Sequence, residues 1–266
     1  MVDIAKQKDK RGIFLDEVGV TGLILPIKVK DRATGKFQSS TGTFDAYVSL
    51  ADDQKGTHMS RIVEAIYKYR DNINQHELTD MAEYLKDNLH AKSSRVTVKF
   101  PYFIERKSPV SGLLNLMTYH VKFTATSNEI TQFILGADVD IMTVCPCAKE
   151  ECGDGSSHVQ RGILSINIVP KKNEWIWLED LINIAEMAAS SPVYDRLKRP
   201  DEKFVVQAGF DNPKFVEDVV RDATVLLETL LPNKYTSSRI SCENQESIHA
   251  HNCRATKLFN WHLQYK

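Results

Sequence analysis

The two halves of this chain predict the same order of strands and helices, and this repetition limits the fold more than any other feature. In the first half, residues 20–30 and 38–50 are rich in β-branched and aromatic side chains, which is typical of strands. Apolar residues then recur at helical spacing at Ile62, Ala65, Ile66 and Tyr69. A second helix is predicted over residues 76–89, followed by strands over 95–105 and 114–127.

The second half predicts strands over residues 132–144 and 158–169, helices over 178–189 and 213–230, and closing strands over 239–244 and 250–263. For the helix of residues 213–230, Asn212 is the expected cap and Pro213 occupies the first turn. Residues 192–202 contain too many interruptions to form a helix throughout.

This duplicated β-β-α(α)-β-β order predicts an α+β protein with antiparallel sheets. A chain of 266 residues allows two similar modules, which we place at residues 1–129 and 130–266.

Charge and hydropathy argue against nucleic acid and membrane partners. The chain has 34 Lys plus Arg against 35 Asp plus Glu, so its net charge is close to zero. We therefore do not expect it to bind polyanions such as nucleic acid. Its apolar runs are too short for a transmembrane helix, and residues 1–12 lack the apolar centre of a signal peptide. We therefore expect a cytoplasmic protein without a membrane partner.

Cysteine usage indicates chemistry or metal binding in the second half. The five cysteines are Cys145, Cys147, Cys152, Cys242 and Cys253. An odd number without a secretory signal favours free thiols over a disulfide framework. Three of them lie within eight residues, and His158 follows closely.

Thiolate and imidazole ligands together favour zinc or iron over magnesium or calcium. Cys145, Cys147, Cys152 and His158 can supply the four ligands of a closed structural zinc site. A catalytic metal would use one or two of these cysteines and leave a position open for water. Unligated, reduced thiols are the third interpretation, and the spacing alone leaves all three open.

Downstream residues add candidates. Asp201 and Glu202 follow Pro200 in a predicted turn, and Glu217 lies on the helix of residues 213–230, away from its apolar stripe. His249 and His251 are two residues apart, so in a strand they would face the same side. Such a pair is a plausible acid–base or ligand set, although an ordinary surface position is an equal alternative for it. For Asp201, Glu202 and Glu217 a solvated surface position is the simpler interpretation.

Seven segments, in consistent order along the chain, together resemble the GTP cyclohydrolase IB family, a prokaryotic enzyme family of folate synthesis. They are residues 54–61 (QKGTHMSR), 105–110 (ERKSPV), 145–150 (CPCAKE), 158–161 (HVQR), 198–203 (KRPDEK), 212–218 (NPKFVED) and 246–249 (ESIH). This resemblance implies the tunnelling fold, with two tandem β-β-α-α-β-β modules per subunit and a homotetrameric assembly. It also implies that GTP is opened at C8 to give formate and 7,8-dihydroneopterin triphosphate, with zinc, manganese or iron as the divalent metal.

The resemblance further implies roles for individual residues. Cys145 is similar to the metal-binding thiolate, with His158 and Glu202 as further ligands, and Cys147 corresponds to a second cysteine near C8. Glu217 is similar to the glutamate that anchors guanine. His249 is similar to a proton donor for ring opening, with Glu246 beside it. Cations for the triphosphate are expected from Arg161, Lys198, Arg199 and Lys203, which flank the implied ligands.

The chain departs from the family pattern at one point. The stretch from Cys145 to His158 is longer by a residue and contains an unexpected cysteine, Cys152, which keeps the closed zinc site open as an alternative. His58 has no chemical role that follows from the sequence, and capping of a helix is the simplest expectation. Three rival functions differ in product or cofactor: an archaeal-type cyclohydrolase that makes a cyclic phosphate, a tunnelling-fold nitrile reductase, and a non-enzymatic structural-zinc protein.

Overall fold

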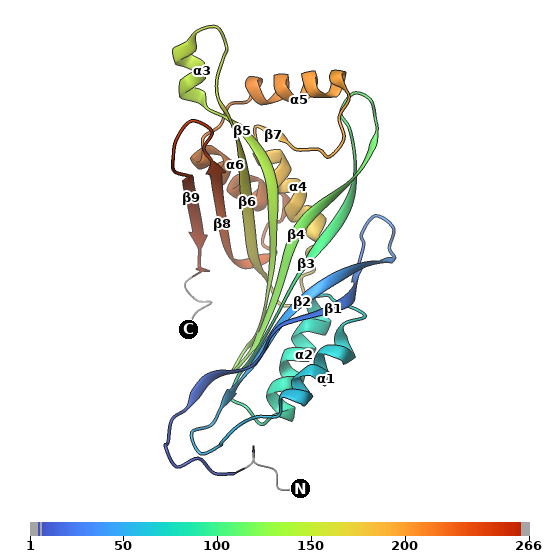
Figure 1. Cartoon of the computed structure of the whole chain (residues 1–266), viewed down its shortest axis with the longest axis vertical. Coiled ribbons are helices and arrows are strands. Elements are labelled where there is room, and N and C mark those ends of the chain that lie inside the picture. Colours follow the sequence, from blue (N-terminus) through green and yellow to red (C-terminus); the bar gives the residue numbers. More distant parts are fainter. Residues whose placement is uncertain (1–4, 6, 262–266) are drawn as a thin grey trace. The chain divides into compact units, whose positions relative to one another are not determined.

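The computed structural model describes Ala5 and residues 7–261, and its architecture is the predicted α+β arrangement (Figure 1). The first elements are β1 (Leu15–Lys30), β2 (Phe37–Leu50), α1 (Met59–Tyr69), α2 (Gln75–Asn88), β3 (Ser94–Lys107) and β4 (Leu114–Ser127). They are followed by β5 (Thr131–Val144), α3 (Pro146–Cys152), β6 (Val159–Pro170), α4 (Leu178–Ala188), β7 (Ser191–Pro192), α5 (Arg199–Asp211), α6 (Val216–Leu230), β8 (Tyr235–Gln245) and β9 (Cys253–Phe259).

The strands follow the order β1-β2-β3-β4-β5-β6-β8-β9, and the short β7 pairs with β5. The pairs β1–β2, β2–β3, β6–β8 and β8–β9 are antiparallel, which confirms the expected sheet type. Neighbouring strands along the chain are therefore mostly neighbours in the sheet, with α3, α4, α5 and α6 inserted between strands of the second half.

The chain forms two compact units. One comprises residues 1–101 and 121–135, and the other comprises residues 102–120 and 136–266. The predicted division into residues 1–129 and 130–266 follows the order of the elements. The limits of the compact units fall within strands, because β3 and β4 each contribute residues to both units.

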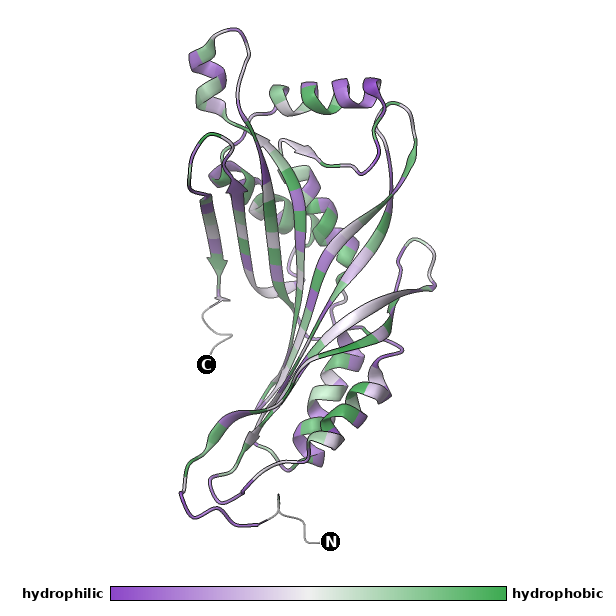
Figure 2. Cartoon of the chain, viewed as in Figure 1, coloured by the Kyte–Doolittle hydropathy of each residue, from purple (hydrophilic) through white to green (hydrophobic). Residues whose placement is uncertain are grey.

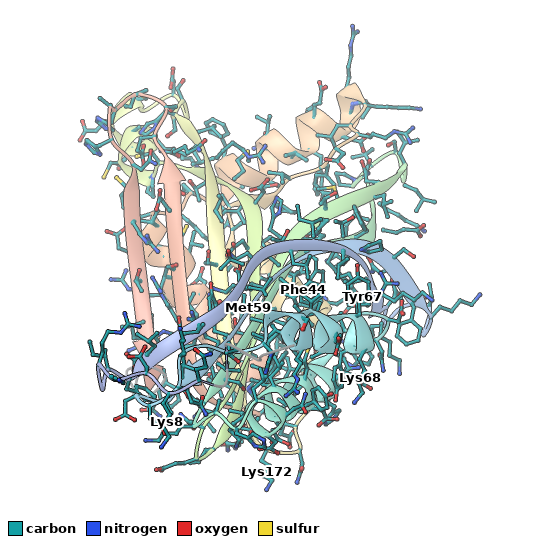
Figure 3. The ribbon with its side chains drawn as sticks, turned by 60° about the horizontal axis from the view of Figure 1, so that its bottom comes forward. Lys8, Phe44, Met59, Tyr67, Lys68 and Lys172 are labelled. Carbon is teal, nitrogen blue, oxygen red and sulfur yellow. The ribbon has the colours of Figure 1, made fainter. Side chains whose placement is uncertain are left out.

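In the first unit, α1 and α2 cover the sheet. Ile62, Ala65 and Ile66 of α1 are buried, as is Phe44 of β2. Met59 and Tyr67 remain exposed toward the two ends of α1 (Figure 3). The second helix begins where the sequence predicted, because the Asn74 side chain accepts hydrogen bonds from the backbone N–H groups of His76 and Glu77. His58 precedes α1, but its side chain makes no capping hydrogen bond.

In the second unit, α4 and α6 pack against β6 and β8. Alternate residues of β6 are buried, and Figure 2 shows the matching alternation of apolar and polar residues along the strands of this unit. Leu181, Ile182 and Ala185 form the buried face of α4. A helix face and alternating strand positions thus supply this core.

Two helices of the second unit differ from expectation. Residues 199–203 were predicted as a turn, yet they form the first part of α5. This helix buries only Asp201, Val205 and Gly209, so its sequence lacks the apolar stripe that would have indicated it. The short α3 starts at Pro146, directly after Cys145, and was likewise not predicted.

Two boundaries also need correction. Helix α6 starts at Val216 rather than Pro213. Its N-cap is Phe215 rather than the expected Asn212, and the backbone N–H of Phe215 donates a hydrogen bond to the Asp218 carboxylate. Residues 246–252 form a loop, so the predicted strand of residues 250–263 starts only at Cys253. The predicted end of that strand at Leu263 lies outside the described residues.

Within the part of the chain that the structure describes, no helix combines the length and apolar character needed to cross a membrane.

Candidate active site

A pocket of about 240 Å³ lies where β6 begins and β8 ends, beside the start of α6. Five of the predicted site residues line this pocket: Cys145, His158, Glu217, Glu246 and His249. They come from positions spread over residues 145–249 of the chain. The fold therefore brings together side chains that the sequence distributes over four separate motifs.

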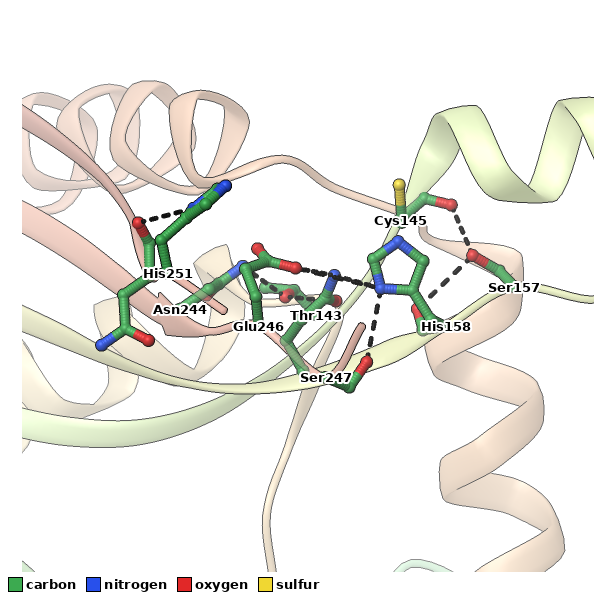
Figure 4. Close-up of polar contacts among 10 residues, drawn as sticks. Thr143, Cys145, Ser157, His158, Asn244, Glu246, Ser247 and His251 are labelled. Carbon is green, nitrogen blue, oxygen red and sulfur yellow. Dashed lines mark hydrogen bonds and ion pairs between the residues drawn. The ribbon is translucent and has the colours of Figure 1, made fainter. Parts of the chain in front are cut away.

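The His158 ring is surrounded by polar partners on its Nδ1 side (Figure 4). Gln160 Nε2 lies 2.8 Å from His158 Nδ1, and Ser247 Oγ lies 3.4 Å from it. Glu246 Oε2 is 3.9 Å from the same nitrogen and accepts a hydrogen bond of 3.0 Å from Gln160 Nε2. The ring is thus held by its Nδ1 edge, beside a mostly buried carboxylate.

Cys145 stands between the end of β5 and the start of α3. Its backbone N–H donates to the carbonyl of His158 at 3.2 Å, and its own carbonyl accepts from Ser157 Oγ at 2.7 Å. These two bonds join the two ends of the segment of residues 145–158, which contains α3, and keep the Cys145 side chain beside the His158 ring (Figure 4).

Three histidine rings form a series along one side of the pocket. The rings of His158 and His249 are perpendicular with centroids 6.4 Å apart, and those of His249 and His251 are stacked at 5.4 Å. The prediction that His249 and His251 share one side of a strand is wrong, because both lie in the loop of residues 246–252. They meet through ring stacking instead, and the loop places both rings at the pocket.

Burial and neighbouring carboxylates raise the pKa of two thiols near the pocket. Burial, the charge of Glu246, a hydrogen bond to that carboxylate and the charge of Glu217 raise the pKa of Cys253. Burial, together with Glu217 and Glu243, raises the pKa of Cys242 to about 12. At neutral pH both groups are protonated thiols, so Cys253 acts as a hydrogen-bond donor to Glu246.

The remaining predicted site residues do not line this pocket: Cys147, Arg161, Lys198, Arg199 and Glu202. Cys147 is exposed on α3, and Glu202 is exposed in the first turn of α5 beside Lys198 and Arg199. Arg161 forms an ion pair of 3.0 Å with Asp140 and lines a separate hollow of about 580 Å³. Lys203 is also exposed on α5.

The implied metal ligands are only partly assembled. Cys145 and His158 line one pocket, but Glu202 does not join them. Among the described residues, no group of three or more His, Cys, Asp or Glu side chains is arranged to hold a metal ion. The alternative set of Cys145, Cys147, Cys152 and His158 is not assembled either, because Cys147 and Cys152 are exposed on α3.

Sequence reasoning missed three polar side chains that support the pocket: Thr143, Gln160 and Asn244. All three are buried on strands. A signal was present in β6, because Gln160 occupies the alternating position that Leu164, Ile166 and Ile168 fill further along the strand. A polar residue in such a series needs a buried partner.

Comparison with solved structures identifies the fold. A hyper-thermostable AgUricase mutant superposes with a TM-score of 0.55 over 92% of this chain and 91% of its own, at 7% identity. Urate oxidase from Bacillus sp. TB-90, in a hyperthermostable mutant form, gives a TM-score of 0.54 over 93% of this chain and 99% of its own, at 10% identity. The chain has the tunnelling fold, as predicted.

Sequence comparison identifies the family. The family model described as type I GTP cyclohydrolase folE2 matches residues 1–255. The protein named GTP cyclohydrolase FolE2 from Geotalea uraniireducens is 42% identical over 255 residues, covering 96% of this chain and 92% of the relative. Its namesake from Desulfosudis oleivorans is 43% identical over 258 residues, covering 96% and 97%. The chain belongs to the type I GTP cyclohydrolase folE2 family and is an enzyme.

This membership corrects the family identified from the sequence motifs. Those motifs indicated the GTP cyclohydrolase IB family, whereas the matching family model and the relatives carry the designation FolE2. The chemical expectation of a cyclohydrolase is unaffected by this correction.

Proposed function

We propose that this chain is a GTP cyclohydrolase that opens the guanine ring of GTP at C8 and supplies folate biosynthesis. The products are formate and 7,8-dihydroneopterin triphosphate, with net uptake of water. The observation that carries the proposal is the convergence of Cys145, His158, Glu217, Glu246 and His249 on one pocket. The cytoplasmic location expected from the sequence belongs to the same proposal.

Glu217 is the proposed anchor of the guanine base. It lies in the first turn of α6 and lines the pocket. The N1–H and the exocyclic amino group of guanine are both donors, so a carboxylate can accept from both. This pairing orients the base and selects guanine over adenine, which presents an acceptor at N1.

His249 is the proposed proton donor. Ring opening at C8 requires a proton at the departing nitrogen, and imidazole is suited to transfer one near neutral pH. Its ring is packed between those of His158 and His251, which restricts its rotation. The Glu246 carboxylate lies 3.9 Å from His158 Nδ1, beside this series of rings.

A divalent metal, zinc, manganese or iron, remains part of the proposal. Cys145 and His158, which line one pocket, would hold it, and Glu202 is the third ligand that the sequence motifs imply. When bound, such an ion would lower the pKa of a coordinated water toward about 7 and would supply hydroxide near neutral pH. Cys147 is proposed to face the C8 side of the substrate.

The pocket of one chain is too small and too poor in cations for GTP. Its volume of about 240 Å³ lies below the range of roughly 300–1,000 Å³ usual for ligand sites. The Lys214 Nζ at the pocket already binds the Ala188 carbonyl at 2.9 Å and Asp222 at 2.7 Å. We therefore propose that the homotetramer implied by the sequence brings further cations, among them Lys198 and Arg199, to the triphosphate.

Incubation with GTP and each of zinc, manganese and iron(II) tests the proposal. Formate and a pterin that becomes fluorescent on oxidation are the expected products, and mass spectrometry should find the triphosphate retained. A cyclic phosphate would instead indicate the archaeal-type reaction. Absence of any pterin with all three metals would contradict the proposed function. Reduction of a deazapurine nitrile with NADPH would support the nitrile reductase alternative.

A further inference from the structure

Three polar side chains form a buried hydrogen-bonded series across the sheet of the second unit. Thr143 lies on β5, Gln160 on β6 and Asn244 on β8, and these three strands are neighbours. The exposed fractions are 0% for Thr143, 4% for Gln160 and 3% for Asn244. Buried polar groups are costly unless each finds a partner, so this arrangement needs a reason.

Hydrogen bonds connect the three residues in one direction. Asn244 Nδ2 donates to Thr143 Oγ1 at 2.8 Å, and Thr143 Oγ1 donates to Gln160 Oε1 at 3.3 Å. This leaves the amide Nε2 of Gln160 facing the pocket, where its two hydrogens reach Glu246 Oε2 and His158 Nδ1. The Glu246 carboxylate can only accept hydrogen bonds, so the amide nitrogen of Gln160 must face it. This requirement fixes the direction of the hydrogen-bonded series.

Glycine at position 162 makes the first of these bonds possible. Gly162 on β6 is the register partner of Asn244 on β8. A Cβ atom at position 162 would lie 2.4 Å from Asn244 Oδ1, which is closer than atoms can approach. The absent side chain therefore leaves the space in which Asn244 passes over β6 to reach Thr143 on β5.

We propose that Gln160 is a positioning residue that holds the His158 ring and the Glu246 carboxylate in one geometry, and that Thr143, Asn244 and Gly162 hold Gln160. One amide reaches both groups, so it fixes the distance between them as well as the rotation of the ring. The nitrogen that Gln160 contacts, His158 Nδ1, is an acceptor, so the neutral ring carries its proton on Nε2. The effect on turnover rests on the proposed function, whereas the effect on the ring does not.

Ring nitrogens observed by ¹⁵N–¹H NMR test the proposal in metal-free protein. In its neutral form, the wild-type His158 should show a single tautomer protonated on Nε2. Gln160→Met removes the donor at similar volume and should give mixed tautomers. Thr143→Val, which removes the hydroxyl that orients Gln160, should shift the same signals and serves if the first variant fails to fold. His158→Asn assigns the resonances.

The matched control variants lie outside the buried hydrogen-bonded series. Gln207→Met changes an exposed glutamine of α5, and Thr97→Val changes a strand threonine of the first unit that bonds Thr124. Neither should alter the His158 signals. Unchanged tautomer populations in both Gln160→Met and Thr143→Val would overturn the proposal.

Kinetics separate this proposal from the proposed function. With metal supplied, Gln160→Met should lower kcat by about 10- to 100-fold while KM for GTP changes little, because the base contacts Glu217 rather than His158. If the wild type makes no pterin with any metal, the proposed function fails, and the NMR result still decides the role of Gln160. Wild-type kcat in Gln160→Met would overturn the positioning role.

Discussion

Two buried serines of the first unit and two buried amides of the second unit differ in their hydrogen-bond partners. In the first unit, Ser94 Oγ donates to the Ala82 carbonyl at 2.5 Å, and Ser49 Oγ accepts from the backbone N–H groups of Lys92 and Ser93. In the second unit, Gln160 and Asn244 bond other side chains, and the connected series ends on His158 and Glu246.

This difference separates a structural use of buried polarity from a functional one. A buried hydroxyl that bonds the main chain stabilises local structure, and its role is complete there. A connected series of side chains is more costly to assemble, and it is useful where its last member must be held for chemistry. Similar strand and helix orders can therefore differ in function through a few buried polar positions.

The largest effect is expected at the pocket. His249→Ala should lower kcat by about 10²–10⁴-fold, because it removes the proposed proton donor. Cys145→Ala should abolish turnover, whereas Cys152→Ala, at an exposed cysteine of α3, should retain it. Steady-state pterin formation measures all three. Equal losses in the Cys145 and Cys152 variants would remove the distinction between pocket and surface thiols.

Glu217→Gln should act on binding rather than on the chemical step. It replaces one acceptor oxygen with a donor facing the guanine edge, and we expect KM for GTP to rise by about 10- to 100-fold, which corresponds to roughly 1.4–2.7 kcal/mol. Glu228→Gln, in the last turn of the same helix, is the control. An unchanged KM with reduced kcat would assign Glu217 to another role.

Core truncations should affect both units alike. Leu78→Ala in α2 and Leu164→Ala in β6 each remove a fully buried side chain. Each should lower the free energy of unfolding by about 2–5 kcal/mol, because a cavity is left in a packed core. Urea denaturation of the two variants measures this. A cost below about 1 kcal/mol in one unit would show that its core packs more loosely than the other.

Removing a helix cap in the first unit should change stability without changing the chemistry. Asn74→Ala loses the bonds to the N–H groups of His76 and Glu77 and should cost about 0.5–2 kcal/mol. Asn88→Ala, at the other end of α2, is the control. Loss of turnover at a temperature where Asn74→Ala is fully folded would contradict the assignment of function to the second unit.

The smallest predicted effect is the acid dependence of stability at Asp201. Burial raises the pKa of this carboxyl, but hydrogen bonds from Ser111, Lys198 and Val110 outweigh it and hold the pKa well below its usual range. Its contribution is therefore complete above the unfolded pKa of about 3.9 and declines as the pH falls below that value toward the folded pKa. Unfolding at pH 7 and at pH 3 measures this acid dependence, which should be weaker in Asp201→Asn.

Regular elements followed closely from local patterns. The predicted strand of residues 114–127 coincides with β4, and α2 and α4 begin or end within a residue or two of their predicted limits. These segments combine clear periodicity with a cap or a turn, so neighbouring residues carry the information. The helix α5 was missed because its few buried residues are selected by contacts with other segments, such as that of Asp201 with the turn at Val110 and Ser111.

Family motifs supplied the candidate site residues, but they could not show which of these meet. Cys145, His158, Glu217, Glu246 and His249 reach one pocket, whereas Arg161 lies on a different surface with Asp140. Adjacent strand residues point to opposite faces, so Gln160 faces the pocket and Arg161 does not. The sequence placed both in the same motif.

By itself, the sequence determined the order of strands and helices, the α+β class and the cysteine and histidine candidates, because periodicity and residue chemistry are local properties. Only the tertiary structure decided that Asn244, Thr143 and Gln160 form one buried series. That series depends on the β5-β6-β8 strand order and on the space beside Gly162. Hydrogen bonds between strands depend on strand register and on donor–acceptor distances to within a few tenths of an ångström. The spacing of residues along the chain determines neither of them.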